Sequence, residues 1–366
     1  MTRLLPRFLA RTHKLGVAGR HNLGCHTREI AADPALRMYG MALALVNALT
    51  AYWFLSGDLA PTMAVGADAI CWPLLPVCDT WRVLDVAGLN LVFRLYGVAS
   101  VAVAVLFGFR RRVVVAYAGL FALTLLKVGL LALDFRLRRN QHYMALAATS
   151  TFLLVPNKRQ ALRLLIVLFY FWAGTLKLNR EWLSGAGLYR PLWFFSGRGV
   201  ELACAYVVLL ELAMVWALLA RRQWLFWGAL GQVLLFHLFS WPVVGYFYPL
   251  VMFGLLSLFP LCRLLRPEGH GQGDGPGMLG SLLRGGAAPA TYLVAGIFSA
   301  LQLVPHLYPG DSALTGEGRL FALHMFDARV LCNARGILTL TDGQTQVVDL
   351  HGRGGRTACD PVVVAG

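Results

Sequence analysis

Charged residues are scarce in this sequence of 366 residues. They make up 14% of it, whereas 58% of the residues are hydrophobic and the mean hydropathy is +0.61. Soluble globular chains contain roughly 25% charged residues. The shortage therefore argues against a soluble domain and predicts an integral membrane protein. Carboxylates are the scarcest charged groups, because 18 Asp and Glu stand against 33 Lys and Arg, which leaves a formal net charge of +15.

Apolar runs of membrane length are what the sequence has instead. A transmembrane helix needs about 20 mainly apolar residues, and nine segments come close to that length. They predict an all-α polytopic membrane protein with about nine transmembrane helices. The fourth and fifth segments are short and separated only by PNKRQALR, so a re-entrant or strongly tilted path is an alternative for these two. The segments lie near residues 38–56, 87–109, 113–133, 142–156, 162–178, 200–220, 224–240, 243–262 and 289–308.

The positive charge follows the connections between these segments. If the N-terminus is inside, the inner connections carry most of the Lys and Arg residues, among them residues 110–112. This bias predicts a cytoplasmic N-terminus and an extracytoplasmic C-terminus in a bacterial inner membrane or its equivalent. The excess positive charge is then explained by the orientation of the protein in the membrane, and no nucleic-acid partner is expected. Residues 1–37 lack the apolar core of a secretory signal peptide, so we expect them to form a basic cytoplasmic tail.

Two regions are expected outside the helical bundle of residues 38–309. Residues 269–286 are glycine-rich, follow a membrane span rather than a strand and lack a GK[ST] ending, which predicts a flexible cytoplasmic linker rather than a phosphate loop. Residues 310–366 contain short apolar runs such as ILTL and QVVDL around DGQT, which predicts a small β-structured extracytoplasmic appendage.

Four cysteines fall outside the membrane under this topology, where disulfides persist. We expect Cys332 to pair with Cys359, because the appendage is too small to build a large core. Cys71 and Cys78 pair with each other or with the tail. A zinc site at CWPLLPVC is disfavoured because six residues separate the two cysteines and no histidine is near. No metal is expected.

Several ionisable side chains lie inside or at the ends of the predicted spans, where each costs on the order of 2.5 to 3.5 kcal/mol on insertion scales. At about 1.5 Å of rise per residue, most fall in the outer half of the membrane, with Lys177 near the outer boundary and Glu211 near mid-depth. A shared polar cavity would reduce their cost, so we expect one that opens toward the outer leaflet. Its lining is expected to be Lys177, His142 and His237, with Trp182 and Tyr143 on the walls; Arg94, Lys127 and Glu211 complete the set of binding candidates.

Structural roles are open for the same residues. Lys177, one turn from a helix end, can extend to the interface instead. Arg94 and Lys127 can pair with Glu211 or with carbonyl groups, and His237 can hydrogen-bond a neighbouring helix. The abundant Tyr and Trp residues mark the membrane interfaces or line a cavity for a flat ligand.

The stretch FYFWAGTLKLNREWLSG resembles the signature of the HTTM (horizontally transferred transmembrane) family, whose membrane domain is shared with vitamin K-dependent gamma-glutamyl carboxylase. In that family an aromatic helix ends in Ala-Gly, two residues, Lys-Leu, an acidic or amide residue, and then a Trp before a Gly. The matching residues are Ala173, Gly174, Lys177, Leu178, Asn179, Trp182 and Gly185. RNQHYMALAA, LLFHLFSWPVVGYFYPLVMFGLLSLF and GEGRLFALHMFDARVLC agree in order and spacing.

The resemblance implies a catalytic role for Lys177 as the base that acts on reduced vitamin K or another quinone, with His142 as a supporting residue. A lipid, or an extracytoplasmic protein or peptide, is the implied further substrate. Asn179 stands where the carboxylase has an acid, and FALHMF lacks the expected Ser-Trp, which disfavours protein gamma-carboxylation. The alternative is a non-enzymatic bundle that binds a lipid or quinone or supports a partner protein. Transport is disfavoured because the inner half offers few polar residues.

Overall fold

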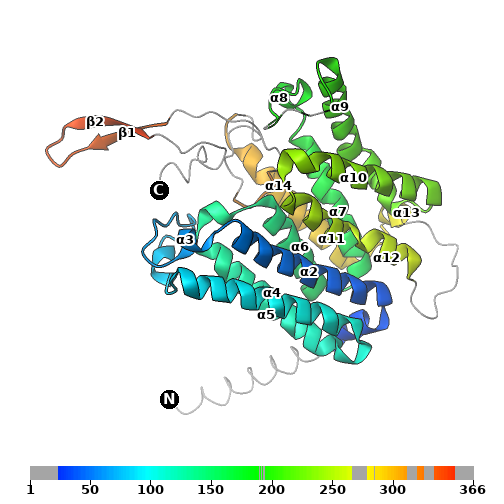
Figure 1. Cartoon of the computed structure of the whole chain (residues 1–366). Helices are drawn as coiled ribbons and strands as arrows, with labels where there is room; N and C mark the ends of the chain where they lie inside the picture. Colours follow the sequence, from blue (N-terminus) through cyan, green and yellow to red (C-terminus); the bar gives the residue numbers. More distant parts are fainter. Residues whose placement is uncertain are drawn as a thin grey trace, which may run out of the picture.

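Long apolar helices run back and forth between two ends of the molecule (Figure 1). The computed structural model describes residues 24–188, 190, 192, 194–265, 278–283, 285–310, 320–324 and 334–350. In these ranges seven helical segments are long and apolar enough to cross a membrane. They are α2 (Pro34–Ser56), α4 (Val86–Gly108), η2 with α5 (Arg110–Arg112, Val113–Ala132), α9 with η4 (Arg198–Leu212, Met214–Leu219), α10 (Gln223–Val244), α11 with α12 (Phe247–Leu256, Leu258–Leu264) and α14 with η5 (Pro289–Leu303, Val304–Leu307).

Two further helices correspond to the fourth and fifth predicted segments. Helix α6 (Asn140–Leu154) has 15 residues, and α7 (Lys158–Thr175) has 18 residues with three cations near its start. They pack against each other and lie inside the bundle, where almost the whole stretch from Ala161 to Tyr170 is buried. The seven apolar helices fit an integral membrane protein, and α6 and α7 supply much of its core.

The bundle has two ends that differ in chemistry. We call the end with the starts of α2, α7 and α10 and the end of α12 the basic end. The opposite end, with the connection over residues 57–85 and the start of α11, is the loop end (Figure 1).

The start of α2 follows from local chemistry: the side chain of Asp33 accepts hydrogen bonds from the amides of Ala35 and Leu36, and Pro34 occupies the first turn. Helix α2 therefore begins four residues before the expected boundary at residue 38.

The connection at the loop end is held by covalent and ionic contacts. It contains α3 (Ala60–Met63) and η1 (Cys78–Trp81), and Cys71 and Cys78 form a disulfide with each other. This confirms one of the two expected pairings. Arg82 ties the connection to the residues after α5, because Nη2 lies 2.7 Å from Oδ2 of the fully buried Asp134. Arg136, in the short helix η3 (Phe135–Leu137), forms an ion pair with the same carboxylate. The hydrogen bond to Asp134 raises the pKa of Arg136.

The C-terminal part contains a small antiparallel hairpin of β1 (Ala334–Thr339) and β2 (Thr345–Leu350), in which Ala334 faces Leu350 and Thr339 faces Thr345. The turn falls on the predicted DGQT. Within the glycine-rich linker, residues 278–283 form the short helix α13 (Met278–Leu283), so that part is not the flexible chain we expected. Cys332 and Cys359 lie outside the described residues.

Candidate functional site

Lys177 is buried and paired rather than extended to the interface. Only 3% of it is exposed, and its Nζ lies 2.6 Å from Oε2 of Glu211, which is itself fully buried. The ammonium group also donates to the carbonyl of Ala173 at 3.2 Å and lies 5.2 Å from the centre of the Trp182 ring. The surroundings of the ammonium are therefore a carboxylate, a carbonyl and an aromatic face.

A close approach of two helices brings this pair together. A Cβ atom on Gly174 of α7 would lie 3.0 Å from Cβ of Glu211 and 2.9 Å from Cδ2 of Leu212 on α9, so only glycine allows this spacing. We expected Glu211 at mid-depth and Lys177 near the boundary, but their contact puts both at one level. The reason is that α9 projects beyond the bundle beside the short helix α8 (Arg180–Leu183) (Figure 1).

The turn after Lys177 is shaped by three residues of NREWLSG. The side-chain oxygen of Asn179 accepts from the amide of Trp182 at 2.8 Å and starts α8. Gly185 has a φ of +75°, which favours glycine, and a Cβ there would lie 2.3 Å from Val200. Trp182 donates from Nε1 to the carbonyl of Cys204 at 3.1 Å. The turn thereby fixes the Trp182 ring against α9 and under the ammonium of Lys177.

His237 forms a second buried pair beside the first. It is fully buried on α10, and its Nε2 lies 2.6 Å from the hydroxyl of Tyr170 on α7. Tyr248, from the first turn of α11, packs edge-on against the His237 ring with ring centres 5.1 Å apart. Lys177 is close enough to His237, and Glu211 to both tyrosines, for electrostatic interaction. Four helices thus contribute to one buried polar cluster, which we call the acid–base cluster: Tyr170, Lys177, Glu211, His237 and Tyr248.

Two atoms of this cluster have hydrogen-bonding capacity left over. Oε1 of Glu211 and Nδ1 of His237 are buried and have no hydrogen-bond partner among the described residues. An unsatisfied buried polar atom costs roughly 1 to 3 kcal/mol. A carboxylate oxygen can only accept a hydrogen bond, whereas an imidazole nitrogen can donate or accept according to its tautomer. A ligand with a hydroxyl group would satisfy either atom.

His142 belongs to a different environment. It is buried on α6 among the rings of Trp53, Phe54 and Phe247, whose centres lie 5.0, 6.0 and 5.2 Å from that of the imidazole, and both ring nitrogens lack partners in the described part of the chain. Lys127 and Arg139 are neighbouring cations, and Lys127 donates to the hydroxyl of Thr50 on α2 at 3.0 Å. Phe247 directly precedes Tyr248, so the first turn of α11 separates this aromatic box from the acid–base cluster.

Two other predicted residues lie elsewhere. Arg94 is exposed on α4 and thus faces the surroundings of the bundle. Tyr143 is half-buried, and its hydroxyl donates to the carbonyl of Phe321 at 2.7 Å, which ties α6 to the segment after α14. The structure therefore brings together Lys177, Glu211, His237 and Trp182 from the predicted set, and it places Lys127 with His142.

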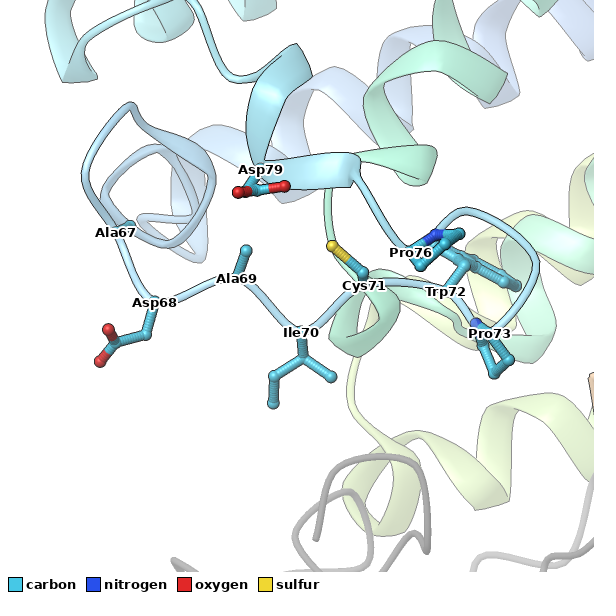
Figure 2. Close-up of a pocket in the computed structure, with 9 residues that line it drawn as sticks. All are labelled: Ala67, Asp68, Ala69, Ile70, Cys71, Trp72, Pro73, Pro76 and Asp79. Carbon is cyan, nitrogen blue, oxygen red and sulfur yellow. The ribbon is translucent and has the colours of Figure 1, made fainter. Parts of the chain in front are cut away.

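An open cleft of about 570 Å³ occurs at the loop end (Figure 2). Its lining residues lie between positions 67 and 79 and include no residue of the acid–base cluster. The cleft is lined by Ala67, Asp68, Ala69, Ile70, Cys71, Trp72, Pro73, Pro76 and Asp79. Figure 2 shows the carboxylates of Asp68 and Asp79 on separate parts of this connection. None of the predicted catalytic residues contributes to the cleft.

No family model matches this sequence, and neither a curated protein nor a solved structure matches it. The resemblance to the HTTM family therefore remains a prediction that rests on the motifs quoted above. Sequence reasoning did not single out Tyr170, Tyr248 or Gly174 as site residues. Tyr170 and Tyr248 did not stand out because the apolar helices contain many aromatic residues. For Gly174, the Ala-Gly of the signature was the available signal.

Proposed function

We propose that this protein is a membrane enzyme whose acid–base cluster removes a proton from a lipid-soluble substrate of the reduced-quinone type. The observation that carries the proposal is the buried contact between Lys177 and Glu211, with the Tyr170–His237 pair beside it. Ionisable groups inside a membrane are costly, so a cluster of them is a functional candidate. This is also the role that the HTTM resemblance implies for Lys177.

The pair has the properties of a proton-transfer site. Lys177 and Glu211 share a contact of 2.6 Å, so a proton can move from the ammonium to the carboxylate without rearrangement. The neutral amine that this transfer forms has a free electron pair that can accept a proton from a bound substrate. Tyr170 and His237 would then pass the substrate proton through their own contact toward the aqueous phase, so that the substrate is left as its anion and one proton is released.

A reduced quinone fits the atoms that lack partners. When bound, it would supply a weakly acidic phenolic hydroxyl on a flat apolar ring. Oε1 of Glu211 would accept from that hydroxyl, and Nδ1 of His237 would hold the second oxygen of the ring.

The charge distribution supports an orientation for the proposed enzyme. In the described part of the chain, the basic end carries eleven Lys and Arg residues and two carboxylates, whereas the loop end carries seven of each sign. Cytoplasmic ends of membrane proteins retain Lys and Arg. We therefore place the basic end in the cytoplasm of a bacterial inner membrane or its equivalent, with nine crossings that include α6 and α7. The cationic residues of the basic end are Arg28, Arg37, Arg110, Arg111, Arg112, Lys158, Arg159, Arg163, Arg221, Arg222 and Arg263.

A non-enzymatic scaffold is the second candidate, and one observation favours it. The ammonium of Lys177 is fully engaged by Glu211, the carbonyl of Ala173 and the Trp182 ring. Such a pair can act as a structural link between α7, α8 and α9 without any chemistry. In that case the bundle would bind a lipid or quinone passively, or support an extracytoplasmic partner.

Binding of a reduced quinone separates the two candidates. The full-length protein is reconstituted in lipid nanodiscs and titrated with a short-chain naphthohydroquinone, while tryptophan fluorescence reports binding and a pH indicator reports proton release. The enzyme proposal expects proton release that Lys177→Arg and Glu211→Gln abolish, because arginine does not act as a base near neutral pH. Arg180→Gln, an exposed change three residues from Lys177, is the matched control and should behave as the parent. Binding without proton release, or no binding, would reject the enzyme and leave the scaffold.

A further inference from the structure

A cluster of arginine side chains occupies the basic end, far along α7 from the acid–base cluster. Arg159 and Arg163 are one helical turn apart near the start of α7, and Arg263 lies near the end of α12. The charges of Arg159 and Arg263 both act on Arg163 and repel it. Arg163 is therefore flanked by two like charges.

Asp33 is the anion that balances Arg159. Its Oδ1 accepts from Nη2 of Arg159 at 2.9 Å, and Oδ2 contacts Nε of the same guanidinium. Nη2 also donates to the carbonyl of Leu265 at 2.8 Å. Arg159 therefore joins the starts of α2 and α7 to the end of α12, and both oxygens of Asp33 are engaged in doing so.

Arg163 is held differently. Its Nη2 donates to the carbonyl of Leu218 at 3.1 Å, and its guanidinium lies 5.8 Å from the centre of the Phe259 ring. Its Nε is buried and has no hydrogen-bond partner within the described ranges. A carbonyl and a ring orient a guanidinium but supply no negative charge, and a buried cation without an anion is costly.

Arg263 is fixed beside the same connection between η4 and α10. Its Nη2 donates to the carbonyl of Arg221 at 2.7 Å, its Nε donates to Oε1 of Gln223 at 3.1 Å, and its guanidinium lies 4.8 Å from the Phe226 ring. Arg163 and Arg263 are thus held in the same way: each guanidinium donates to a backbone carbonyl and lies near an aromatic ring. This arrangement holds two planar guanidinium groups at neighbouring positions of α7 and α12.

We infer that Arg163 and Arg263 bind a phosphate ester between α7 and α12. A phosphate offers several oxygens to planar guanidinium groups, and arginine binds it in a bidentate manner. Arg163 lies five residues from the start of α7, about 7.5 Å along the helix axis from the basic end. The phosphate can come from an anionic phospholipid or from a soluble phosphate compound. The inference is independent of the acid–base cluster.

The parent protein provides the first test. Its thermal midpoint is measured in a neutral detergent after addition of phosphatidylglycerol, of phosphatidylcholine or of inorganic phosphate. We expect phosphatidylglycerol to raise the midpoint more than phosphatidylcholine, because the choline ammonium of phosphatidylcholine offsets the charge of its phosphate. An equal rise with inorganic phosphate would support the site and identify a soluble phosphate as the ligand. If neither phosphatidylglycerol nor phosphate raises the midpoint, the inference is overturned, whatever the variants do.

Two matched variants test the location. Arg163→Gln should weaken the apparent affinity for phosphatidylglycerol about tenfold, because it removes a charge-assisted hydrogen bond. Arg222→Gln removes the same charge from an exposed position at the same end and should keep the parental affinity. Equal effects of the two variants would show general attraction to the basic end and would reject a built site. Arg163→Lys keeps the charge without the planar group, so it should lie between the parent and Arg163→Gln, and it serves as the test if Arg163→Gln does not fold.

Discussion

The ammonium of Lys177 lies 2.6 Å from the carboxylate of Glu211, although 34 residues separate them in the sequence. Both side chains are almost completely removed from solvent. Lys177 lies two residues beyond the end of α7, and Glu211 is the penultimate residue of α9, so the contact joins the end of one helix to the end of another. A buried ion pair of this kind is costly to break from one side only.

Removal of one partner is therefore expected to destabilise the protein more than removal of both. Lys177→Met should lower the free energy of unfolding by about 3 kcal/mol, because Glu211 keeps a buried carboxylate without its cation. The double variant Lys177→Met/Glu211→Leu should recover most of this loss. The measurement is unfolding of the detergent-solubilised protein by denaturing detergent, with Arg180→Met as the surface control. Additive losses in the double variant would contradict a coupled pair.

Gly174 is expected to control the spacing on which this contact depends. A Cβ at this position would lie at 2.9 to 3.0 Å from Leu212 and Glu211, so Gly174→Val should push α9 away from α7. We expect a loss of about 1 to 3 kcal/mol in the free energy of unfolding. Gly129→Val is the control, because a Cβ at Gly129 on α5 meets nothing within 4 Å. Equal stability of the two variants would show that α9 can move without consequence.

The helical segment over residues 24–32 should be sensitive to acid. Burial, reinforced by the charge of Lys158, lowers the pKa of His26 below its ordinary value of 6.5. Nζ of Lys158 lies 2.9 Å from Nδ1 of His26, and the carboxylate of Glu29 lies 3.8 Å from the same Nζ. Because the folded state holds the proton less readily than the unfolded state, stability from His26 is present above pH 6.5 and is lost as the pH falls through the folded-state pKa.

The measurement for His26 is the thermal midpoint between about pH 7.5 and pH 5.5. His26→Asn should show a smaller decrease over this range than the parent protein. His306→Asn, at an exposed residue of the loop end, should decrease as the parent does. A parental pH dependence in His26→Asn would mean that other groups account for the acid sensitivity.

The path of α6 and α7 is expected to consist of two full crossings. Pro156 and Ser184 are both exposed and lie beyond the opposite ends of α7. Single cysteines at these positions, in a background without Cys25, Cys204, Cys262, Cys332 and Cys359, should react with an impermeant thiol reagent from opposite sides of the membrane. Arg111→Cys, between α4 and α5, marks the basic end and should react together with Pro156→Cys. Reaction of Pro156→Cys and Ser184→Cys from one side would reduce the count of crossings.

Composition and local pattern were enough to predict an integral membrane protein and most of its helices. Apolar composition and the length of the apolar runs identify membrane helices because hydrocarbon requires internally satisfied backbone groups. Short apolar runs around DGQT predicted a small β-structured part where β1 and β2 form. These features depend on residues that are close in the sequence. The helix start at Asp33 and Pro34 was also encoded locally, although the apolar pattern alone put it four residues later.

Tertiary structure decided which side chains meet. Hydropathy gives approximate depth but not the rotation of each helix, so the contact of Lys177 with Glu211 and that of Tyr170 with His237 were not predictable. The expected difference in depth between Lys177 and Glu211 does not agree with their contact, because α9 projects from the bundle beside α8 (Figure 1). The choice of Cys71 as the partner of Cys78 was likewise left open until the chain was folded. Helix rotation and projection are set by packing, at Gly174 above all, and packing depends on residues far apart in the sequence.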